Sequence, residues 1–198
     1  MKTQETRIPG CYLLDGDLHR DVRGSFYKML HRPTLEALGL ESDFVESFIT
    51  TSCKGTVRGM HFQEPPAEHA KLVSCVTGTV LDVLVDLRRG SPVYGVPVYF
   101  PLRGDTTALL YIAAGVAHGF AALEDNTRML YYVTTVHDPA RDRGVAWNSI
   151  GLDWQKAVED CGLAGLRWED SRPILSERDK AQPALAEYRS PFVFEARS

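Results

Sequence analysis

Residues 44–136 form a succession of short runs rich in β-branched and aromatic side chains, and turn residues separate these runs. Helical periodicity is almost absent from this stretch, which indicates that its apolar residues are buried by strands. We expect strands at residues 44–52, 57–63, 71–77, 79–87, 96–102, 109–112 and 128–136. So many short strands in one chain predict an all-β barrel or sandwich.

The run at residues 79–87 is the clearest of these strands. Its odd positions are a threonine followed by leucines and valines, whereas Asp82 and Asp86 lie among the even positions. Because successive side chains of a strand point to opposite faces, one face is apolar and the other carries carboxylates. Gly78 precedes this strand and tolerates a positive φ, so we expect a tight turn that joins it to residues 71–77 in a hairpin.

Helix signals are few and lie outside the strand-rich stretch. Pro33 suits the first turn of a helix, and the leucines that follow it are stopped by a glycine. Trp154, Val158 and Cys161 recur at helical spacing and predict a second short amphipathic helix near the C-terminus. With 198 residues the chain fits one domain, residues 1–198, with these helices at its periphery.

Charge, cysteines and missing motifs narrow the function classes. The formal net charge is −4 and the 22 basic residues are scattered, so no nucleic-acid partner is expected. The four cysteines form no CxxC pair, which favours reduced thiols in a cytoplasmic protein. The N-terminus lacks a signal-peptide core, and the longest apolar stretch, residues 108–117, is too short to span a bilayer. No glycine-rich phosphate loop is present for a nicotinamide cofactor or a nucleoside triphosphate.

The segment TVRGMHFQEPP places His61 on an expected strand, with Arg58 nearby and a Pro-Pro turn after it. Strict alternation puts Val57, His61 and Gln63 on the inward face of that strand. A single strand histidine is usually a packed or surface residue. Its ordinary pKa of about 6.5 also allows it to accept a proton at neutral pH.

Several separated motifs of the chain occur in the same order in a known family. They are RGMHFQEPP, KLVSCVTGTVLDVLVDLRRGSPVYG, AGVAHGF and PILSERD. In these motifs, over residues 21–179, the chain resembles the dTDP-4-dehydrorhamnose 3,5-epimerase family of the cupin superfamily. The resemblance implies an all-β double-stranded β-helix (cupin or jelly-roll) barrel with short peripheral helices, usually a homodimer. It also implies epimerisation of a nucleotide-diphosphate sugar without a metal.

The histidines give an independent argument about the metal. Metal-binding cupins typically have a HxH pair and a later histidine, whereas this chain has His61-Phe62-Gln63 and then His118. Two imidazoles with no clearly placed third protein ligand make a weak transition-metal site, because even catalytic zinc normally keeps three protein ligands. We therefore expect no metal, and no cofactor of another kind.

The resemblance assigns catalytic roles to residues of several motifs. His61 matches the family's base, Asp179 in SERD matches the carboxylate that pairs with it, and Tyr131 in MLYYVT matches the proton donor. A carboxylate on one imidazole nitrogen fixes the tautomer and stabilises the imidazolium. Lys71, inside an apolar strand, is our first candidate for stabilising the enolate oxygen, with Arg58 beside it.

Other matched positions imply contacts with the substrate. The resemblance places Arg23 and His118 around the sugar and the diphosphate, where charge-assisted hydrogen bonds would hold phosphate oxygens. Arg178 stands where the family commonly has lysine. For each of these basic residues the alternative is an ordinary solvated surface charge.

Four positions expected around the substrate depart from the family's pattern. Lys28 and Phe48 stand where many members carry a glutamate and an asparagine, and Glu46 replaces a glutamine. His137 stands where a tyrosine often stacks on the thymine. Since the implied base, acid and carboxylate are intact, the sequence predicts the family's chemistry on a changed substrate.

The leading hypothesis is an isomerase that inverts C3, C5 or both of a nucleotide-diphosphate-linked 4-keto-6-deoxyhexose. Three alternatives stay open at this level. The same barrel could move the carbonyl of a keto sugar, which needs a base but no acid on the opposite face. It could bind a sugar nucleotide without turnover, or it could be a metal-dependent oxygenase. The sequence leaves the nucleotide base open among dTDP, CDP and GDP.

Overall fold

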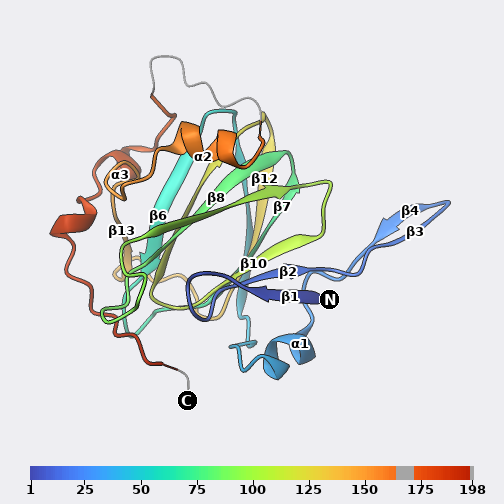
Figure 1. Ribbon diagram of the computed structural model, residues 1–198, viewed down its shortest axis with the longest axis horizontal. Helices are drawn as coiled ribbons and strands as arrows, with labels where there is room; N and C mark the ends of the chain where they lie inside the picture. Colours follow the sequence, from blue (N-terminus) through green and yellow to red (C-terminus); the bar gives the residue numbers. More distant parts are fainter. Residues whose placement is uncertain (164–171, 197–198) are drawn as a thin grey trace.

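Two antiparallel sheets make up the body of the computed structural model, which describes residues 1–163 and 172–196 (Figure 1). The first sheet contains, in spatial order, β1 (Lys2–Glu5), β2 (Tyr12–Asp15), β10 (Ala108–Ile112), β7 (Lys71–Thr77), β12 (Thr127–Val133) and β5 (Glu46–Ser52). The second contains β13 (Asp142–Gly144), β6 (Val57–Gln63), β11 (Val116–Ala122), β8 (Thr79–Asp86) and β9 (Pro97–Arg103).

From β5 onward the chain is a long antiparallel hairpin wound into a barrel. β8 pairs with β9, β7 with β10, β6 with β11 and β5 with β12. Along each arm of this hairpin, successive strands lie in alternate sheets. This arrangement is a double-stranded β-helix, so the predicted all-β cupin barrel with short helices is confirmed.

The expected hairpin between residues 71–77 and 79–87 is wrong. β7 and β8 lie in different sheets, and the strand that pairs with β8 as a hairpin is β9. Gly78 does have the predicted positive φ, 82°, but its turn carries the chain from one sheet to the facing one. A glycine between two alternating runs suits both connections, and periodicity does not distinguish them.

The alternation predicted for the strand at residues 79–87 is confirmed, because its two faces enter different apolar layers. Leu81 and Val83 pack in a layer on the outer side of the second sheet, together with Trp154 of α2 (Trp154–Asp160). Leu84 points the other way, into the layer between the sheets. Full burial of each such side chain contributes about 1.5–3 kcal/mol.

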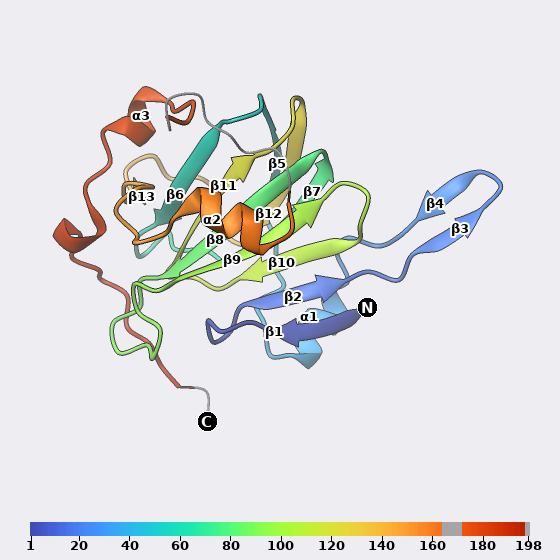
Figure 2. The same ribbon diagram turned by 45° about the horizontal axis from the view of Figure 1, so that its top comes forward.

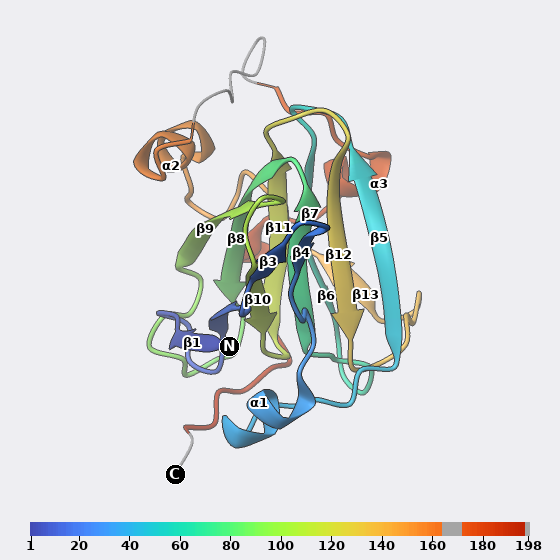
Figure 3. The same ribbon diagram turned by 90° about the vertical axis from the view of Figure 1, so that its right-hand side faces the viewer.

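A third apolar layer covers the outer side of the first sheet. Leu72 of β7 and Leu109 of β10 pack there against Leu35 of α1 (Arg32–Ala37). Both predicted short helices are therefore present, and each packs on the outer side of a different sheet; Figure 3 shows α2 near the top of the view and α1 at the bottom. No helix of the described residues is long and apolar enough to cross a membrane.

Some elements carry no clear signal in the sequence. β3 (His19–Asp21) and β4 (Gly24–Phe26) form a hairpin that extends away from the sheets (Figure 1). β11 is buried along its whole length, so it lacks the alternation of a half-exposed strand. After α3 (Glu177–Lys180) and a 3-10 turn (Leu185–Glu187), the C-terminal segment runs along one side of the barrel (Figure 2).

The crossing at Gly78 predicts a large loss of stability on substitution. A Cβ at Gly78 would lie 2.4 Å from Thr127 Oγ1, and φ is 82°. Gly78→Ala should lower the free energy of unfolding by roughly 2–4 kcal/mol, from the left-handed backbone and the clash together. Gly151→Ala is the matched control, since its φ is 73° and no atom lies within 4 Å of the new Cβ. Equal losses for both variants in urea unfolding would contradict the close approach.

Candidate active site

A cavity of about 410 Å³ lies among strands of both sheets. β5, β12 and β7 of the first sheet contribute side chains to it, as do β6, β11 and β13 of the second. Three residues outside these strands also line it: His69 before β7, His137 after β12, and Arg178 of α3. The winding of the barrel thus brings side chains from positions 46 to 178 to one place.

His61 reaches this cavity because β6 does not alternate strictly. Val57 and Met60 both belong to the apolar layer outside the sheet, whereas Arg58 and His61 both line the cavity. The members of each pair are three residues apart, and strict alternation would put them on opposite faces. The prediction that Val57 shares the inward face of His61 is therefore wrong.

Gly59 lies where the alternation breaks. Its φ is 135°, a conformation that L side chains rarely adopt, and the pairing of β6 with β11 shifts register here. A Cβ on Gly59 would lie 2.5 Å from Gly119 Cα, so the two backbones approach at a point where glycine is required. On the far side of this irregularity, His61 lies directly across from His118.

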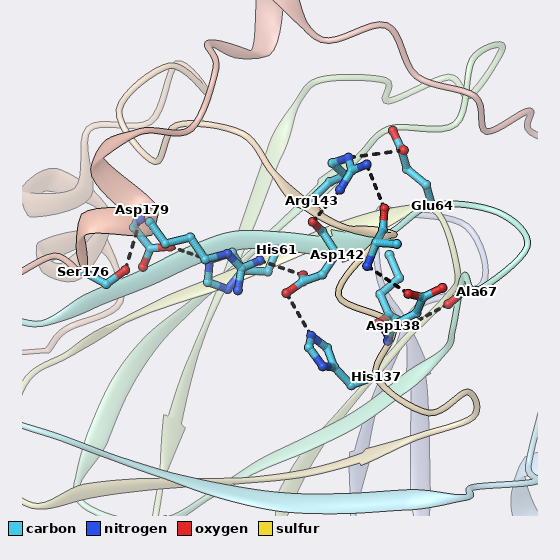
Figure 4. Close-up of polar contacts among 12 residues, drawn as sticks. His61, Glu64, Ala67, His137, Asp138, Asp142, Arg143, Ser176 and Asp179 are labelled. Carbon is cyan, nitrogen blue, oxygen red and sulfur yellow. Dashed lines mark hydrogen bonds and ion pairs between the residues drawn. The ribbon is translucent and has the colours of Figure 1, made fainter.

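Asp179 meets His61 across 118 residues of sequence (Figure 4). His61 Nε2 donates to Asp179 Oδ1 at 2.6 Å, and the side chains are 27% and 4% exposed. Asp179 is held in α3, where its backbone N–H donates to the N-cap Ser176 Oγ at 3.0 Å. Because Nε2 is committed to the carboxylate, Nδ1 is the nitrogen that carries the free lone pair of the neutral ring.

Burial and the carboxylate act on the His61 pKa in opposite directions. Burial is the larger effect and holds the pKa of His61 below its ordinary value, although the hydrogen bond and charge of Asp179 raise it. Burial is also the largest single effect on the pKa of Asp179 and acts to raise it. The hydrogen bonds from His61 and Ser176 and the nearby positive charges together outweigh burial, so this pKa lies below the usual range. The pair at neutral pH is therefore a neutral imidazole on a carboxylate, which can accept a proton.

A second histidine–carboxylate pair lies next to the first. His118 Nε2 donates to Asp82 Oδ2 at 2.8 Å, and these side chains are 4% and 0% exposed. Burial raises the pKa of Asp82, against the pull of His118. Alternation predicted that Asp82 lies on the carboxylate-bearing face of its strand, but not that this face meets His118 of β11.

Tyr131 enters the cavity from the opposite sheet to His61. It is 6% exposed, and burial raises its pKa, so the phenol keeps its proton at neutral pH. Its ring stacks on Phe48 of β5 at 4.6 Å, and His118 meets it edge-on at 5.9 Å. The neighbouring Tyr132 points to the other face and packs against Phe44.

Two cations lie deep in the site. Lys71 is 8% exposed, its Nζ donates to the backbone oxygen of His61 at 3.0 Å, and burial lowers its pKa to about 8. Arg58 Nε donates to Ser52 Oγ at 3.0 Å, which ties the guanidinium to the end of β5. Both predicted basic residues therefore line the cavity beside the histidines.

A group of charged residues surrounds the mouth of the cavity (Figure 4). Asp142 accepts hydrogen bonds from His137 Nε2 at 3.1 Å and from Arg178 at 2.6 Å. Glu46 accepts the backbone N–H of His137 at 3.1 Å. Asp142 was missed because nothing near it in the sequence distinguishes it from a surface carboxylate; the three-residue strand β13 brings it here.

Gln63, at the position where metal-binding cupins have a histidine, holds the surrounding loops. Its side-chain amide donates to the Ala67 oxygen at 2.7 Å, and its amide oxygen accepts the backbone N–H of Asp138 at 2.6 Å. Among residues 1–163 and 172–196, no group of three or more His, Cys, Asp or Glu side chains is placed to hold a metal ion.

Arg23 and Lys28 are not at the cavity within this chain. Arg23 lies at the turn of the β3–β4 hairpin, is 86% exposed and pairs with Asp21. Lys28 follows that hairpin and lines a separate hollow with His31. Within a single chain these two residues therefore do not lie at the predicted substrate site, because the hairpin extends away from the sheets.

Comparisons with known proteins agree with this geometry. The sequence model of the family described as dTDP-4-dehydrorhamnose 3,5-epimerase matches residues 5–187. A Mycobacterium tuberculosis dTDP-4-dehydrorhamnose 3,5-epimerase is 32% identical over 193 residues, which cover 96% of this chain and 90% of that protein. The chain belongs to the dTDP-4-dehydrorhamnose 3,5-epimerase family. The predicted family and the predicted isomerase class are both confirmed.

Other members of the epimerase family show its range. A dTDP-4-dehydrorhamnose 3-epimerase of Streptomyces niveus is 34% identical over 190 residues, covering 96% of this chain and 86% of that protein. The crystal structure of a Legionella pneumophila 3,5-epimerase, in complex with dTDP-4-keto-L-rhamnose, superimposes with a TM-score of 0.85 at 28% identity. That alignment covers 98% of this chain and 99% of the other.

Replacing Asp179 by asparagine should lower the pKa of His61 further. Asp179 is the group that most strongly raises this pKa against burial. NMR titration of the His61 ring in both proteins measures the change. Asp142→Asn is the matched control, because it removes a carboxylate of the same cavity that contacts His137 and Arg178 instead. An unchanged or raised His61 pKa in Asp179→Asn would contradict the pairing.

Proposed function

We propose that this epimerase inverts C3, C5 or both of a nucleotide-diphosphate-linked 4-keto-6-deoxyhexose. The observation that carries the proposal is the placement of a base and an acid on facing walls of one cavity. His61 with Asp179 belongs to the second sheet and α3, and Tyr131 to the first sheet. Inversion needs a proton removed from one face of a carbon and another delivered to the opposite face.

The proposed reaction uses each of these groups once at each carbon. His61 Nδ1 takes the proton next to the keto group, and the C–H electrons form a C=C bond while the carbonyl becomes an enolate. Lys71 and Arg58 are the cations that would stabilise the enolate oxygen. Tyr131 then gives its proton to the carbon from the other side as the enolate returns to the carbonyl. The His61 imidazolium releases its proton to solvent and the Tyr131 phenolate takes one from solvent, so no net proton is consumed.

The substrate's nucleotide part is inferred from relatives and from the mouth of the cavity. The Legionella pneumophila structure holds dTDP-4-keto-L-rhamnose, and one from Bacillus anthracis holds TDP and PPi. In this chain Arg178 remains as a donor for phosphate oxygens, and His118, whose Nε2 donates to Asp82, lines the cavity where the sugar would lie. Glu46 and His137, bound to one another at the mouth, are proposed to contact the nucleotide base.

A homodimer is the proposed assembly, in the cytoplasm. β5 is an edge strand of the first sheet, and its Ile49 is 58% exposed. The β3–β4 hairpin exposes Val22 and Phe26, at 105% and 60%. Long apolar edges and exposed apolar hairpins are usually covered in the native assembly. A second copy could also supply the Arg23 that one chain leaves outside its own cavity.

Solvent exchange tests the proposal. When the enzyme is incubated in D₂O with a 4-keto-6-deoxy sugar nucleotide, it should place deuterium at C3 or C5. NMR of the sugar measures this incorporation. His61→Asn should lower this exchange by about 10²–10⁴-fold, the usual contribution of a general base. His31→Asn, at the exposed N-cap of α1, is the matched control and should exchange as the wild type does. No label with any of the dTDP, CDP and GDP substrates, or full activity in His61→Asn, would overturn the proposal.

A further inference from the structure

Phe48 and Tyr131 form a flat aromatic stack inside the cavity. They are direct cross-strand partners on β5 and β12. Their ring centroids are 4.6 Å apart and the ring planes differ by 12°. Phe48 is 42% exposed, whereas Tyr131 is 6% exposed, so the phenyl ring lies between the phenol and the open edge of the sheet.

The direction of the Tyr131 hydroxyl depends on the packing of its ring. The hydroxyl oxygen lies on the axis about which the ring turns, so it moves only when the whole ring tilts about the Cα–Cβ bond, and neighbouring rings decide how far it can tilt. Phe48 is the neighbour that lies flat against it, and His118 touches it edge-on from the facing sheet at 64°. His118 is itself fixed by Asp82. Removing Phe48 would therefore leave the ring supported by His118 but free on its stacked face.

We propose that Phe48 is a positioning residue for proton delivery by Tyr131: its ring keeps the phenol from tilting, so that the hydroxyl stays directed at the carbon opposite His61. The inference rests on the function proposed above. It differs from a direct contact between Phe48 and substrate, because it acts through Tyr131 and concerns only the second proton transfer.

The enolate has two fates, and only one of them depends on Tyr131. His61, after its proton has exchanged with solvent, can return a deuteron to the same face, which labels the substrate without inversion. Tyr131 can break its O–H or O–D bond and protonate the opposite face, which gives the inverted product. The ratio of exchange without inversion to inversion therefore reports the placement of the phenol, while the deprotonation by His61 is common to both fates.

Two substitutions distinguish a requirement for the flat aromatic contact from a requirement for apolar volume alone. Phe48→Leu keeps apolar volume and loses the planar face, and Phe48→Tyr keeps the face. We expect Phe48→Leu to raise the ratio by about three- to tenfold, the factor that corresponds to the energy of one aromatic pair. Phe48→Tyr should stay within about twofold of the wild type. Val96→Ala is the control: Val96 is 40% exposed, lies just before β9 and outside the cavity lining, and its variant should give the wild-type ratio.

The measurement is NMR of substrate and product in D₂O, with both rates taken from one time course. Equal losses of exchange and inversion in Phe48→Leu would mean a general structural role and would overturn the inference, as would an unchanged ratio. A ratio that rises equally in Phe48→Tyr would also overturn it. A wild-type enzyme that exchanges neither carbon would overturn the proposed function together with this inference, whereas the other outcomes leave that function intact.

Discussion

The close approach of β6 and β11 at Gly59 and Gly119 is the constraint on which the site depends. A Cβ at Gly59 would collide with the Gly119 backbone, so the two strands come together only where both residues are glycine. The register shift at this point turns His61 into the cavity and places it across from His118. With a regular strand, the inward face would hold Val57 and the histidine would no longer share the side of Arg58.

Electrostatics then determines what the paired histidines do. Each imidazole has one carboxylate, but the environments differ: His61 is 27% exposed at its pair with Asp179, and His118 is 4% exposed at its pair with Asp82. His61, the more exposed of the two histidines, can exchange protons with water. The buried pair of His118 and Asp82 instead holds the His118 ring against Tyr131. Lys71, whose Nζ donates to the backbone oxygen of His61, contributes a cation, and its pKa, lowered by burial to about 8, leaves it mostly charged at neutral pH.

Features set by local sequence or shared with the family could be predicted, whereas contacts that depend on how the strands wind into the barrel could not. The bounds of strands β6 and β7 were predicted to the residue, because turn residues separate these β-rich runs from their neighbours. The link at Gly78 was misassigned, since a hairpin and a crossing between sheets have the same local pattern. The contact of Asp142 with Arg178 and the stack of Phe48 on Tyr131 carried no signal, because each joins residues that are far apart in sequence and meet only in the folded barrel. For Arg23 the family resemblance predicted a contact with the substrate, but in a single chain this residue lies outside the cavity.

The most direct test of the account is the separation of proton removal from proton delivery. The central claim is that His61 and Tyr131 act on opposite faces of one carbon from facing sheets. Tyr131→Phe, incubated in D₂O with a 4-keto-6-deoxy sugar nucleotide, should still introduce deuterium next to the keto group, because His61 and Asp179 are intact. It should form the inverted product at least about 10²-fold more slowly than the wild type. Inversion at the wild-type rate in this variant would contradict the account.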